Sequence, residues 1–253
     1  MRVKKHNFFV PHWPCPSSVK CVITYRFGGA SKEPYKSNNL ATHVGDKSEA
    51  VIANRESLKE KLALPGDPIW LNQIHGVEII EVEDGYQISD GDGFYCRKKG
   101  FPCGILTADC LPILVCNTLG TEIAAIHAGW RGLSNRIIKN LLKMFHAPAD
   151  QLLVYLGPAI GLDNFEVGSE VREYFLANSE NCEHRKQIDN AFYPSKGQKL
   201  KADLYELARA DFRIGGVKRM FGGEFCSFKE KDHFYSYRRD KITGRNATLI
   251  WLE

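Results

Sequence analysis

The stretch Ile123-Ala-Ala-Ile-His-Ala-Gly-Trp-Arg-Gly132 joins an apolar run to a glycine-containing turn. Apolar residues then recur at helical spacing, so we predict a strand, a tight turn and an amphipathic helix over residues 133–145. His127 falls at the predicted end of the strand and Arg131 at the predicted start of the helix. Because a helix N-terminus presents unpaired N–H groups and a positive dipole end, this place suits an anion beside a metal ligand.

The composition of the 253 residues is that of an ordinary globular protein, with 43% hydrophobic and 25% charged residues. The net charge of +4 is mild and no basic tract is long, so we expect no nucleic-acid partner. No apolar run reaches the ~18 residues of a membrane span and no signal-peptide pattern is present, so we expect a cytoplasmic protein without a membrane contact. The eight cysteines include no Cys-x-x-Cys pair, and most are expected to be buried thiols.

The first part of the chain predicts strands over residues 19–25 and 69–75 and a helix over residues 47–62. Asp46 is the expected N-cap of this helix, with Glu49 as its capping-box partner. The residues expected to face the core from this helix are Val51, Ile52, Leu58 and Leu62. The acidic, glycine-rich residues 90–94 resemble the start of a calcium loop but lack the closing Glu, which excludes an EF-hand.

Residues 104–116 form two apolar runs interrupted at Asp109 and Cys110, which predicts strand, break, strand. Pro112 argues against one unbroken central strand. The expected elements farther along are a strand from residue 152, a helix over 167–177, a polar loop over 178–199, a helix over 200–213 and two strands with a polar turn over 234–251. This irregular alternation indicates mixed sheets. No repeat or linker marks a boundary, so residues 1–253 are predicted to form a single domain.

Three predicted breaks after apolar runs each carry a side chain that binds transition metals: His75, Cys110 and His127. Strand ends on one side of a sheet can converge, which would bring two imidazoles and a thiolate together. This donor set suits Zn²⁺, and three protein ligands leave a fourth position for water or substrate. The pattern is therefore that of a catalytic rather than a structural metal site.

A rival hypothesis uses Cys110 as a nucleophile, with His75 or His127 as base and Asp109 as the group that orients the base. A thiolate cannot easily be a metal ligand and a free nucleophile in the same state, so metal titration separates the two hypotheses. The eight histidines include no His-x-His pair, which weighs against the trinuclear centre of a multicopper oxidase.

Several motifs together resemble the YfiH family, whose members were long labelled laccase-domain or polyphenol oxidases. The resemblance runs from about residue 20 to 251, and its most specific motifs are Ala-Asp-Cys-x-Pro and His-Ala-Gly-Trp-Arg-Gly. The matching stretches are Thr24-Tyr-Arg-Phe-Gly-Gly29, Asn39-Leu40, His43-Val-Gly-Asp46, Asn54-Arg55, Gln73-Ile-His-Gly76, Thr107-Ala-Asp-Cys-Leu-Pro112, His127-Ala-Gly-Trp-Arg-Gly132, Leu156-Gly-Pro-Ala-Ile-Gly161, Ser236-Tyr-Arg-Arg-Asp240 and Thr243-Gly-Arg245.

The resemblance implies an α+β fold with mixed sheets packed between helices in α-β-β-α layers. It places the family's metal ligands on His75, Cys110 and His127. It also implies phosphorolysis of the purine nucleosides adenosine, inosine and methylthioadenosine, and deamination of adenosine, with zinc as cofactor. Copper-dependent phenol oxidation is the older alternative. We expect a monomer or a weak homo-oligomer.

The implied chemistry suggests further roles. Deamination needs a proton carrier, for which Asp109 and His43 are the candidates. Phosphorolysis needs a holder for phosphate, for which Arg131 is the first candidate and Arg26 and Arg238 are the next.

Overall fold

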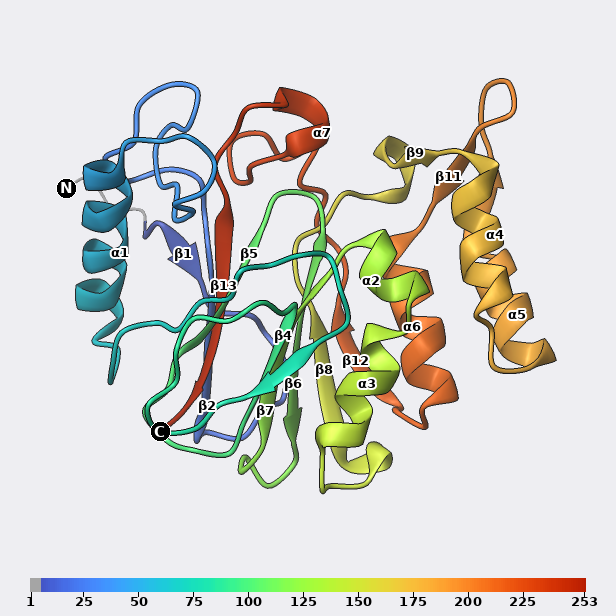
Figure 1. Ribbon diagram of the computed structural model, residues 1–253, viewed down its shortest axis with the longest axis horizontal. Helices are drawn as coiled ribbons and strands as arrows, with labels where there is room; N and C mark the ends of the chain where they lie inside the picture. Colours follow the sequence, from blue (N-terminus) through green and yellow to red (C-terminus); the bar gives the residue numbers. More distant parts are fainter. Residues whose placement is uncertain (1–5) are drawn as a thin grey trace.

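A six-stranded mixed sheet lies at the centre of the protein, as seen in a computed structural model that describes residues 6–253 (Figure 1). The strand order is β12-β8-β6-β7-β4-β3, antiparallel in the middle, with the parallel pairs β12·β8 and β3·β4 at the two edges. These strands are β3 (Ile79–Glu81), β4 (Gly93–Cys96), β6 (Leu111–Asn117), β7 (Ile123–Ala128), β8 (Leu152–Leu156) and β12 (Arg219–Gly222).

A second sheet of four antiparallel strands packs against the first, in the order β1-β2-β13-β5. Its strands are β1 (Phe8–Phe9), β2 (Val19–Thr24), β5 (Cys103–Thr107) and β13 (Asn246–Leu252). A small third sheet is formed by β9 (Glu166–Val167), β10 (Phe192–Pro194) and β11 (Leu200–Ala202).

Alternating side chains of the strands fill different cores, because successive residues of a strand point to opposite faces. Cys21 and Ile23 of β2 pack between the two sheets, while Val22 faces the opposite side. In β6, Leu114 likewise packs between the sheets and Ile113 faces the helices. Both sheets are therefore buried on two sides, which explains why their strands are nearly continuous apolar runs.

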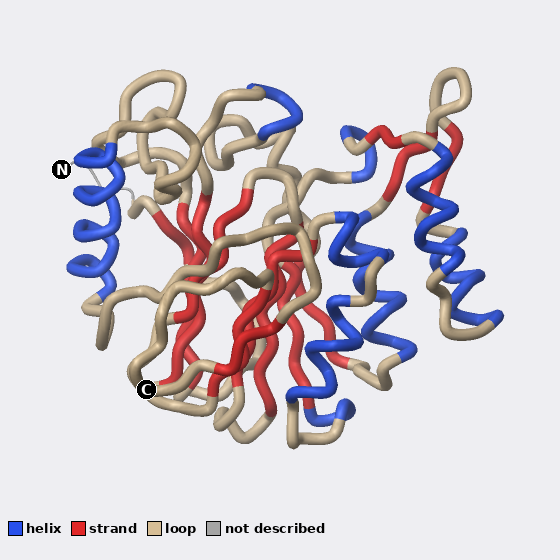
Figure 2. The backbone as a smooth tube through the Cα atoms, in the orientation of Figure 1, coloured by secondary structure: helices blue, strands red, loops and turns tan. Residues whose placement is uncertain are grey.

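Helices cover the outer faces of the two sheets (Figures 1 and 2). Helix α1 (Ser48–Leu62) lies on the four-stranded sheet. The six-stranded sheet is covered by α2 (Trp130–Ser134), α3 (Ile137–Met144) and α6 (Leu204–Ile214). Outside these lie α4 (Ser169–Ala177) and α5 (Cys182–Asp189), and short turns are formed by η1 (Ala149–Gln151), η2 (Leu162–Asn164) and α7 (Tyr237–Asp240). The predicted class of mixed sheets between helices is confirmed.

The predicted helix over residues 133–145 is two helices, α2 and α3. Arg136 adopts a left-handed backbone conformation, with φ at 71°, and so ends one helix before the next begins. Its guanidinium reaches Asp211 of α6 at 3.2 Å and Glu180 at 3.0 Å. Leu133 and Ile137 are still buried on the same side, so the apolar periodicity continues through the break and hides it.

Three further predictions on secondary structure were wrong. Residues 178–199 contain α5 and β10 instead of a loop; α5 is highly charged because it buries little besides His184 and Ile188. The helix predicted over residues 200–213 begins at Leu204, after the short strand β11. Residues 234–251 contain the short helix α7 before a single strand, β13, because the Ser236 hydroxyl caps α7 by accepting from the Arg239 N–H.

The segments around the first helix also differ from the prediction. The Asp46 carboxylate accepts hydrogen bonds from the Lys47 N–H and the Asn39 amide instead of capping α1, whose N-cap is Lys47. Ile52 is 52% exposed rather than in the core. Residues 69–75 form isolated bridges at Ile69 and Asn72 instead of a strand. No helix among residues 6–253 is long and apolar enough to cross a membrane.

Candidate functional site

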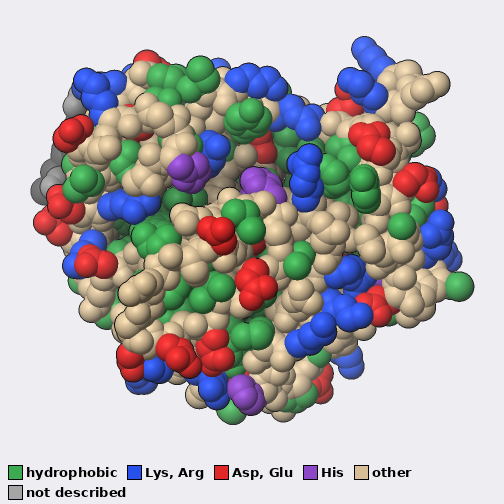
Figure 3. All heavy atoms as spheres, viewed as in Figure 1, with side chains coloured by type: hydrophobic (Ala, Val, Ile, Leu, Met, Phe, Trp, Pro, Cys, Tyr) green, Lys and Arg blue, Asp and Glu red, His purple; other side chains and the backbone are tan. Residues whose placement is uncertain are grey.

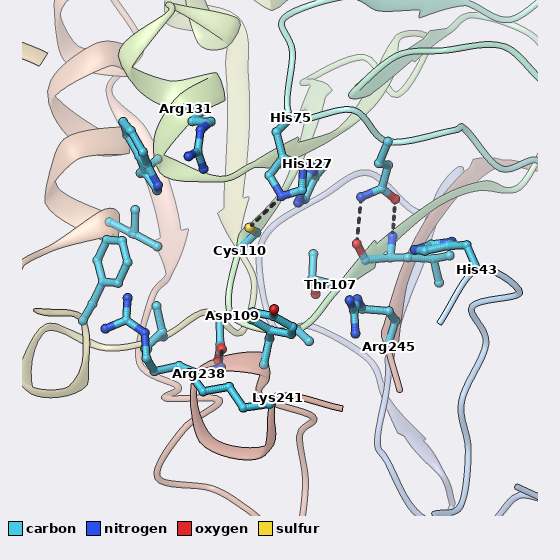
Figure 4. Close-up of a pocket in the computed structure, with 18 residues that line it drawn as sticks. His43, His75, Thr107, Asp109, Cys110, His127, Arg131, Arg238, Lys241 and Arg245 are labelled. Carbon is cyan, nitrogen blue, oxygen red and sulfur yellow. Dashed lines mark hydrogen bonds between the residues drawn. The ribbon is translucent and has the colours of Figure 1, made fainter. Parts of the chain in front are cut away.

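His75, Cys110 and His127 come together where the two sheets meet (Figure 4). His127 lies on β7, Cys110 lies in the turn between β5 and β6, and His75 lies in a bend before β3. Their potential ligand atoms all lie within 4.8 Å of one another. The Cys110 Sγ is 3.8 Å from His75 Nε2, and the two imidazole rings lie 4.7 Å apart at 80°. The structure thus brings together the three residues that the sequence predicts as metal ligands.

The fully buried carboxylate of Asp92 positions both imidazoles. Its Oδ1 lies 2.8 Å from His127 Nδ1 and accepts a hydrogen bond from the His75 N–H at 3.0 Å. Its Oδ2 accepts from the N–H groups of Gly76 at 2.6 Å and Ile74 at 3.2 Å. His75 has φ at 59°, an uncommon value for a residue with a side chain, and these bonds hold the bend in place. With Nδ1 bound to Asp92, the Nε2 of His127 is left for a metal.

Sequence reasoning missed Asp92. Its acidic, glycine-rich surroundings resemble a calcium loop, and that pattern does not predict a carboxylate that binds imidazoles. The available signal was a lone buried carboxylate next to β4, which needs partners because an unpaired buried charge is costly.

Two other residues shape the space around the three ligands. The Gln73 amide forms two hydrogen bonds of 2.8 Å with the backbone of Leu106 on β5, which anchors the segment that carries His75. A Cβ atom at Gly129 would lie 2.9 Å from Cys110 Sγ and 3.3 Å from the His75 ring. A side chain at position 129 would therefore enter the ligand cluster.

Two of the three ligands, Cys110 and His127, stabilise each other's charged forms. Burial opposes ionisation of the Cys110 thiol, but the nearby imidazoles of His127 and His75 outweigh it and lower its pKa to about 6. Burial likewise opposes protonation of His127, yet Cys110 and Asp92 raise its pKa to about 9. The pKa of Asp92 is lowered despite burial, because His127 and the two backbone N–H groups stabilise its charge. In the absence of a cation, a thiolate and an imidazolium therefore form an ion pair.

These donors fit a tetrahedral metal ion with N and S ligands. Zn–N bonds of about 2.0–2.1 Å and Zn–S bonds of about 2.3 Å place neighbouring N and S donors about 3.5–3.6 Å apart at tetrahedral angles. The separation of 3.8 Å between Cys110 Sγ and His75 Nε2 is within about 0.3 Å of that value. An ion of charge +2 would also replace the proton of His127 as the partner of the thiolate.

The three ligands line a cavity of about 410 Å³. Figure 3 shows the hollow in this face, with histidine side chains and Lys and Arg side chains gathered around it. The cavity also contacts His43, Asp109, Arg131 and Arg238. It further contacts residues that the sequence hypothesis did not include, among them Thr107, Tyr237, Lys241 and Arg245. Cavities of this size hold a molecule as large as a nucleoside.

His43 lines the cavity in a state suited to exchange a proton. Burial, and then the charges of Arg245 and Arg55, lower the pKa of its imidazole below the ordinary value. His43 is therefore neutral at physiological pH and has a free nitrogen to accept a proton.

Asp109 also lines the cavity, but both of its carboxylate oxygens are engaged elsewhere. Oδ1 accepts from the Ser227 hydroxyl at 2.6 Å, and Oδ2 accepts from the Ser236 hydroxyl at 3.0 Å and the Arg238 N–H at 2.6 Å. These bonds fasten α7 to the turn that carries Cys110. Within the ligand cluster, the carboxylate that orients an imidazole is that of Asp92, not of Asp109 as the nucleophile hypothesis assumed.

The arginines named as phosphate holders are placed differently from one another. Arg131 and Arg238 line the cavity. Arg26 does not: its guanidinium donates to the carbonyls of Lys36 and Lys231 and lies 3.7 Å from Asp240. Arg26 therefore holds loops together, and its expected place at the anion site was wrong.

Residues 20–253 match the protein family described as multi-copper polyphenol oxidoreductase laccase. The chain belongs to this family. Relatives that match this chain over nearly their whole length are named differently. The chain is 43% identical over 247 residues to the purine nucleoside phosphorylase YfiH of Escherichia coli (strain K12), covering 97% of this chain and 99% of that protein. It is 44% identical over 247 residues to a purine nucleoside phosphorylase of Pseudomonas aeruginosa, covering 97% and 98%.

Solved structures of the family have the same fold. A Neisseria meningitidis protein, 41% identical, superimposes with a TM-score of 0.90 over 98% of this chain and 100% of its own. YlmD from Geobacillus stearothermophilus, 26% identical, also superimposes with a TM-score of 0.90, over 99% of this chain and 97% of its own. The resemblance to YfiH proteins is confirmed, and its relatives' names support an enzyme.

Proposed function

We propose that this protein is a metal-dependent purine nucleoside phosphorylase that uses Zn²⁺ held by His75, Cys110 and His127. The proposed substrates are adenosine, inosine and methylthioadenosine, together with inorganic phosphate. The observation that supports it most is the position of the three ligands on the wall of a nucleoside-sized cavity, in a chain whose relatives are named for this reaction. We also propose that residues 1–253 form a single domain.

Phosphorolysis requires the cavity to hold an anion next to the ribose. An oxygen of hydrogenphosphate attacks C1′, the C1′–N9 bond breaks with its electron pair going to the purine, and the proton of the phosphate ends on the base. Positive side chains lower the cost of bringing the phosphate out of water. Four cationic side chains on the cavity wall can supply this charge, namely Arg131, Arg238, Lys241 and Arg245.

Deamination of adenosine is the second proposed activity of the same site. A Zn²⁺ ion held by His75, Cys110 and His127 would supply Lewis-acid chemistry at this place, which lowers the pKa of water to about 7. Water adds to C6 of the purine and ammonia leaves, so a nearby group must accept a proton and return it. We propose His43 for this transfer, since it is neutral and lines the cavity. Asp109 is the weaker candidate because three donors already occupy its oxygens.

Metal analysis of the purified protein followed by product analysis tests the proposal. We expect about one zinc ion per chain, ribose-1-phosphate from inosine only when phosphate is present, and inosine from adenosine without phosphate. The variant Cys110→Ala should lose zinc and both activities together, whereas Cys182→Ala, at an exposed position outside the cavity, should retain them. Full turnover by a metal-free Cys110→Ala protein would contradict the zinc proposal.

Two alternatives are separated by the same protein preparations. The thiolate–imidazolium pair backed by Asp92 has the arrangement of a cysteine nucleophile with its base, which favours a cysteine hydrolase as the second candidate. That enzyme would work without metal and be inhibited by zinc. Copper-dependent phenol oxidation, which the family description suggests, would appear as oxygen uptake that depends on copper.

A further inference from the structure

The cavity holds four cationic side chains without a carboxylate partner. Arg131, Arg238, Lys241 and Arg245 line it. Among residues 6–253, no carboxylate lies within ion-pair distance of any of them, whereas arginines elsewhere, such as Arg172 and Arg209, are paired. The one acidic side chain of the lining is Asp109, whose oxygens accept hydrogen bonds from two hydroxyls and a backbone N–H. Such an excess of positive charge is expected where a ligand supplies the negative charge.

The cations lie on two sides of the metal ligands. Figure 4 shows Arg131 and Arg238 on one side of His75, Cys110 and His127, and Arg245 with His43 on the other.

On the first side, the guanidinium groups are already covered by aromatic rings. Arg131 lies 4.5 Å from the centre of the Trp130 ring, and Arg238 lies 5.4 Å from the centre of the Phe165 ring. Arg238 also donates to the Glu166 carbonyl at 2.9 Å. The neighbouring lining residues Ile160 and Leu204 are apolar. Flat, apolar and cationic surfaces of this kind suit a purine base.

On the second side, Arg245 is held in place with much of its donor capacity left over. Its Nη1 donates to the carbonyls of Thr243 and Gly244, both at 3.0 Å, and its backbone N–H donates to the Asn39 amide oxygen at 2.9 Å. The half-buried guanidinium therefore sits rigidly just before β13, with Nε and Nη2 available. Thr107 of β5, which also lines the cavity, lies beside it in Figure 4 and offers a hydroxyl.

We infer that Arg245 is the phosphate-binding residue of the site, and that the purine base occupies the Trp130–Phe165 side. This inference rests on the proposed phosphorolysis. The attacking phosphate oxygen forms its bond to C1′ on the face opposite to the bond that breaks, so phosphate and purine must lie at opposite ends of the cavity. For phosphorolysis, the two sides described above provide those ends, with the ribose between them. Deamination requires a second pose of the nucleoside, in which C6 of the purine faces the metal ligands and His43. A planar guanidinium with free donors matches the geometry of phosphate oxygens.

The test compares Arg245→Gln, Arg245→Lys and Phe165→Leu with the unmodified zinc-loaded protein. Isothermal titration with inorganic phosphate alone measures binding without turnover, and steady-state kinetics measure KM for phosphate and for inosine separately. Arg245→Gln should weaken phosphate binding about 10- to 100-fold, as loss of charge-assisted hydrogen bonds predicts, and change KM for inosine little. The phosphate affinity of Arg245→Lys should lie between those of Arg245→Gln and the unmodified protein. Lysine keeps the positive charge but lacks the planar pair of N–H donors of a guanidinium. Phe165→Leu should show the reverse pattern.

Controls separate a local effect from misfolding. Arg97→Gln makes the same chemical change at an exposed residue paired with Glu81, outside the cavity, and should alter neither binding nor turnover. Zinc content and the unfolding temperature verify that each variant is folded. Unchanged phosphate affinity in folded Arg245→Gln, or a higher KM for inosine instead, would overturn the assignment, as would a lack of phosphate binding by the unmodified protein. Phosphate binding that depends on Arg245 without any phosphorolysis would leave the assignment standing and refute the proposed function.

Discussion

Replacing Asp92 with Asn should lower both the stability of the protein and the affinity of the site for a metal. The carboxylate accepts from two donors at each oxygen: His127 Nδ1 and the His75 N–H at Oδ1, and the Gly76 and Ile74 N–H groups at Oδ2. An Asn side chain accepts at one atom only. Its NH₂ group must face one of the two pairs, so two of the four donors lose their acceptor whichever way the amide is turned.

The size of the effect follows from those four contacts. A fully buried donor left without a partner costs about 1–3 kcal/mol, and the backbone donors here are only partly buried. We therefore expect Asp92→Asn to lower the free energy of unfolding by less than about 6 kcal/mol. Loss of a group that orients a metal-bound His weakens metal affinity about 10- to 100-fold, or about 1.4–2.8 kcal/mol. Both imidazoles depend on Asp92, so we expect the upper part of the affinity range.

The assay is a zinc titration in competition with a coloured chelator, together with thermal unfolding at several zinc concentrations. Asp90→Asn is the matched control, because Asp90 is exposed, lies two residues away and contacts only the Asn72 side chain among the described side chains. It should leave zinc affinity unchanged. The reasoning would be refuted by an Asp92→Asn protein that is folded and binds zinc within about twofold of the unmodified affinity.

Three further predictions concern the same region. Gly129→Ala should reduce zinc affinity with little loss of stability, because its backbone φ of −71° suits any residue and the new Cβ meets Cys110 Sγ; unchanged zinc affinity would contradict this. In the metal-free protein, alkylation of Cys110 by iodoacetamide should be fast at pH 7 and slow as pH falls through about 6, because its lowered pKa keeps it as thiolate above that value, and zinc should block the reaction. A rate at pH 7 equal to that of the exposed Cys182 would count against the thiolate. Arg26→Gln should lower the unfolding temperature yet leave KM for phosphate unchanged, since Arg26 lies outside the cavity; a raised KM would return it to the site.

The strand and turn around His127 were predictable because a short apolar run that ends at a glycine is compatible with few structures other than a buried strand and a turn. The break at Arg136 was not, because the two helices bury the same face and their combined periodicity looks like one helix. The apolar pattern before His75 predicts a strand. The segment is extended instead because of isolated bridges and the hydrogen bond of the Gln73 amide to the Leu106 backbone.

The grouping of His75, Cys110 and His127 rested on residue type and position after apolar runs, and the structure places them together for a different reason. Their convergence depends on Asp92. Its role can be recognised only from three contacts with residues that are distant in the sequence. Arg245 was part of a matching motif, but sequence cannot show that a cation lacks a partner. Arg26 was favoured from its motif alone, and its ion pair with Asp240 is likewise visible only in three dimensions.

The turn that carries Cys110 is also the place where the chain leaves one sheet and enters the other, from β5 to β6. A ligand shared by this turn, by β7 and by the bend before β3 would connect the two layers of the sandwich at one edge. Occupancy of the site would then contribute to cohesion of the whole molecule, by about 4 kcal/mol at a free concentration one thousand times Kd. Amide hydrogen exchange in β5 and β6 should slow as the ion binds, because the metal site would also hold the two sheets together at this edge.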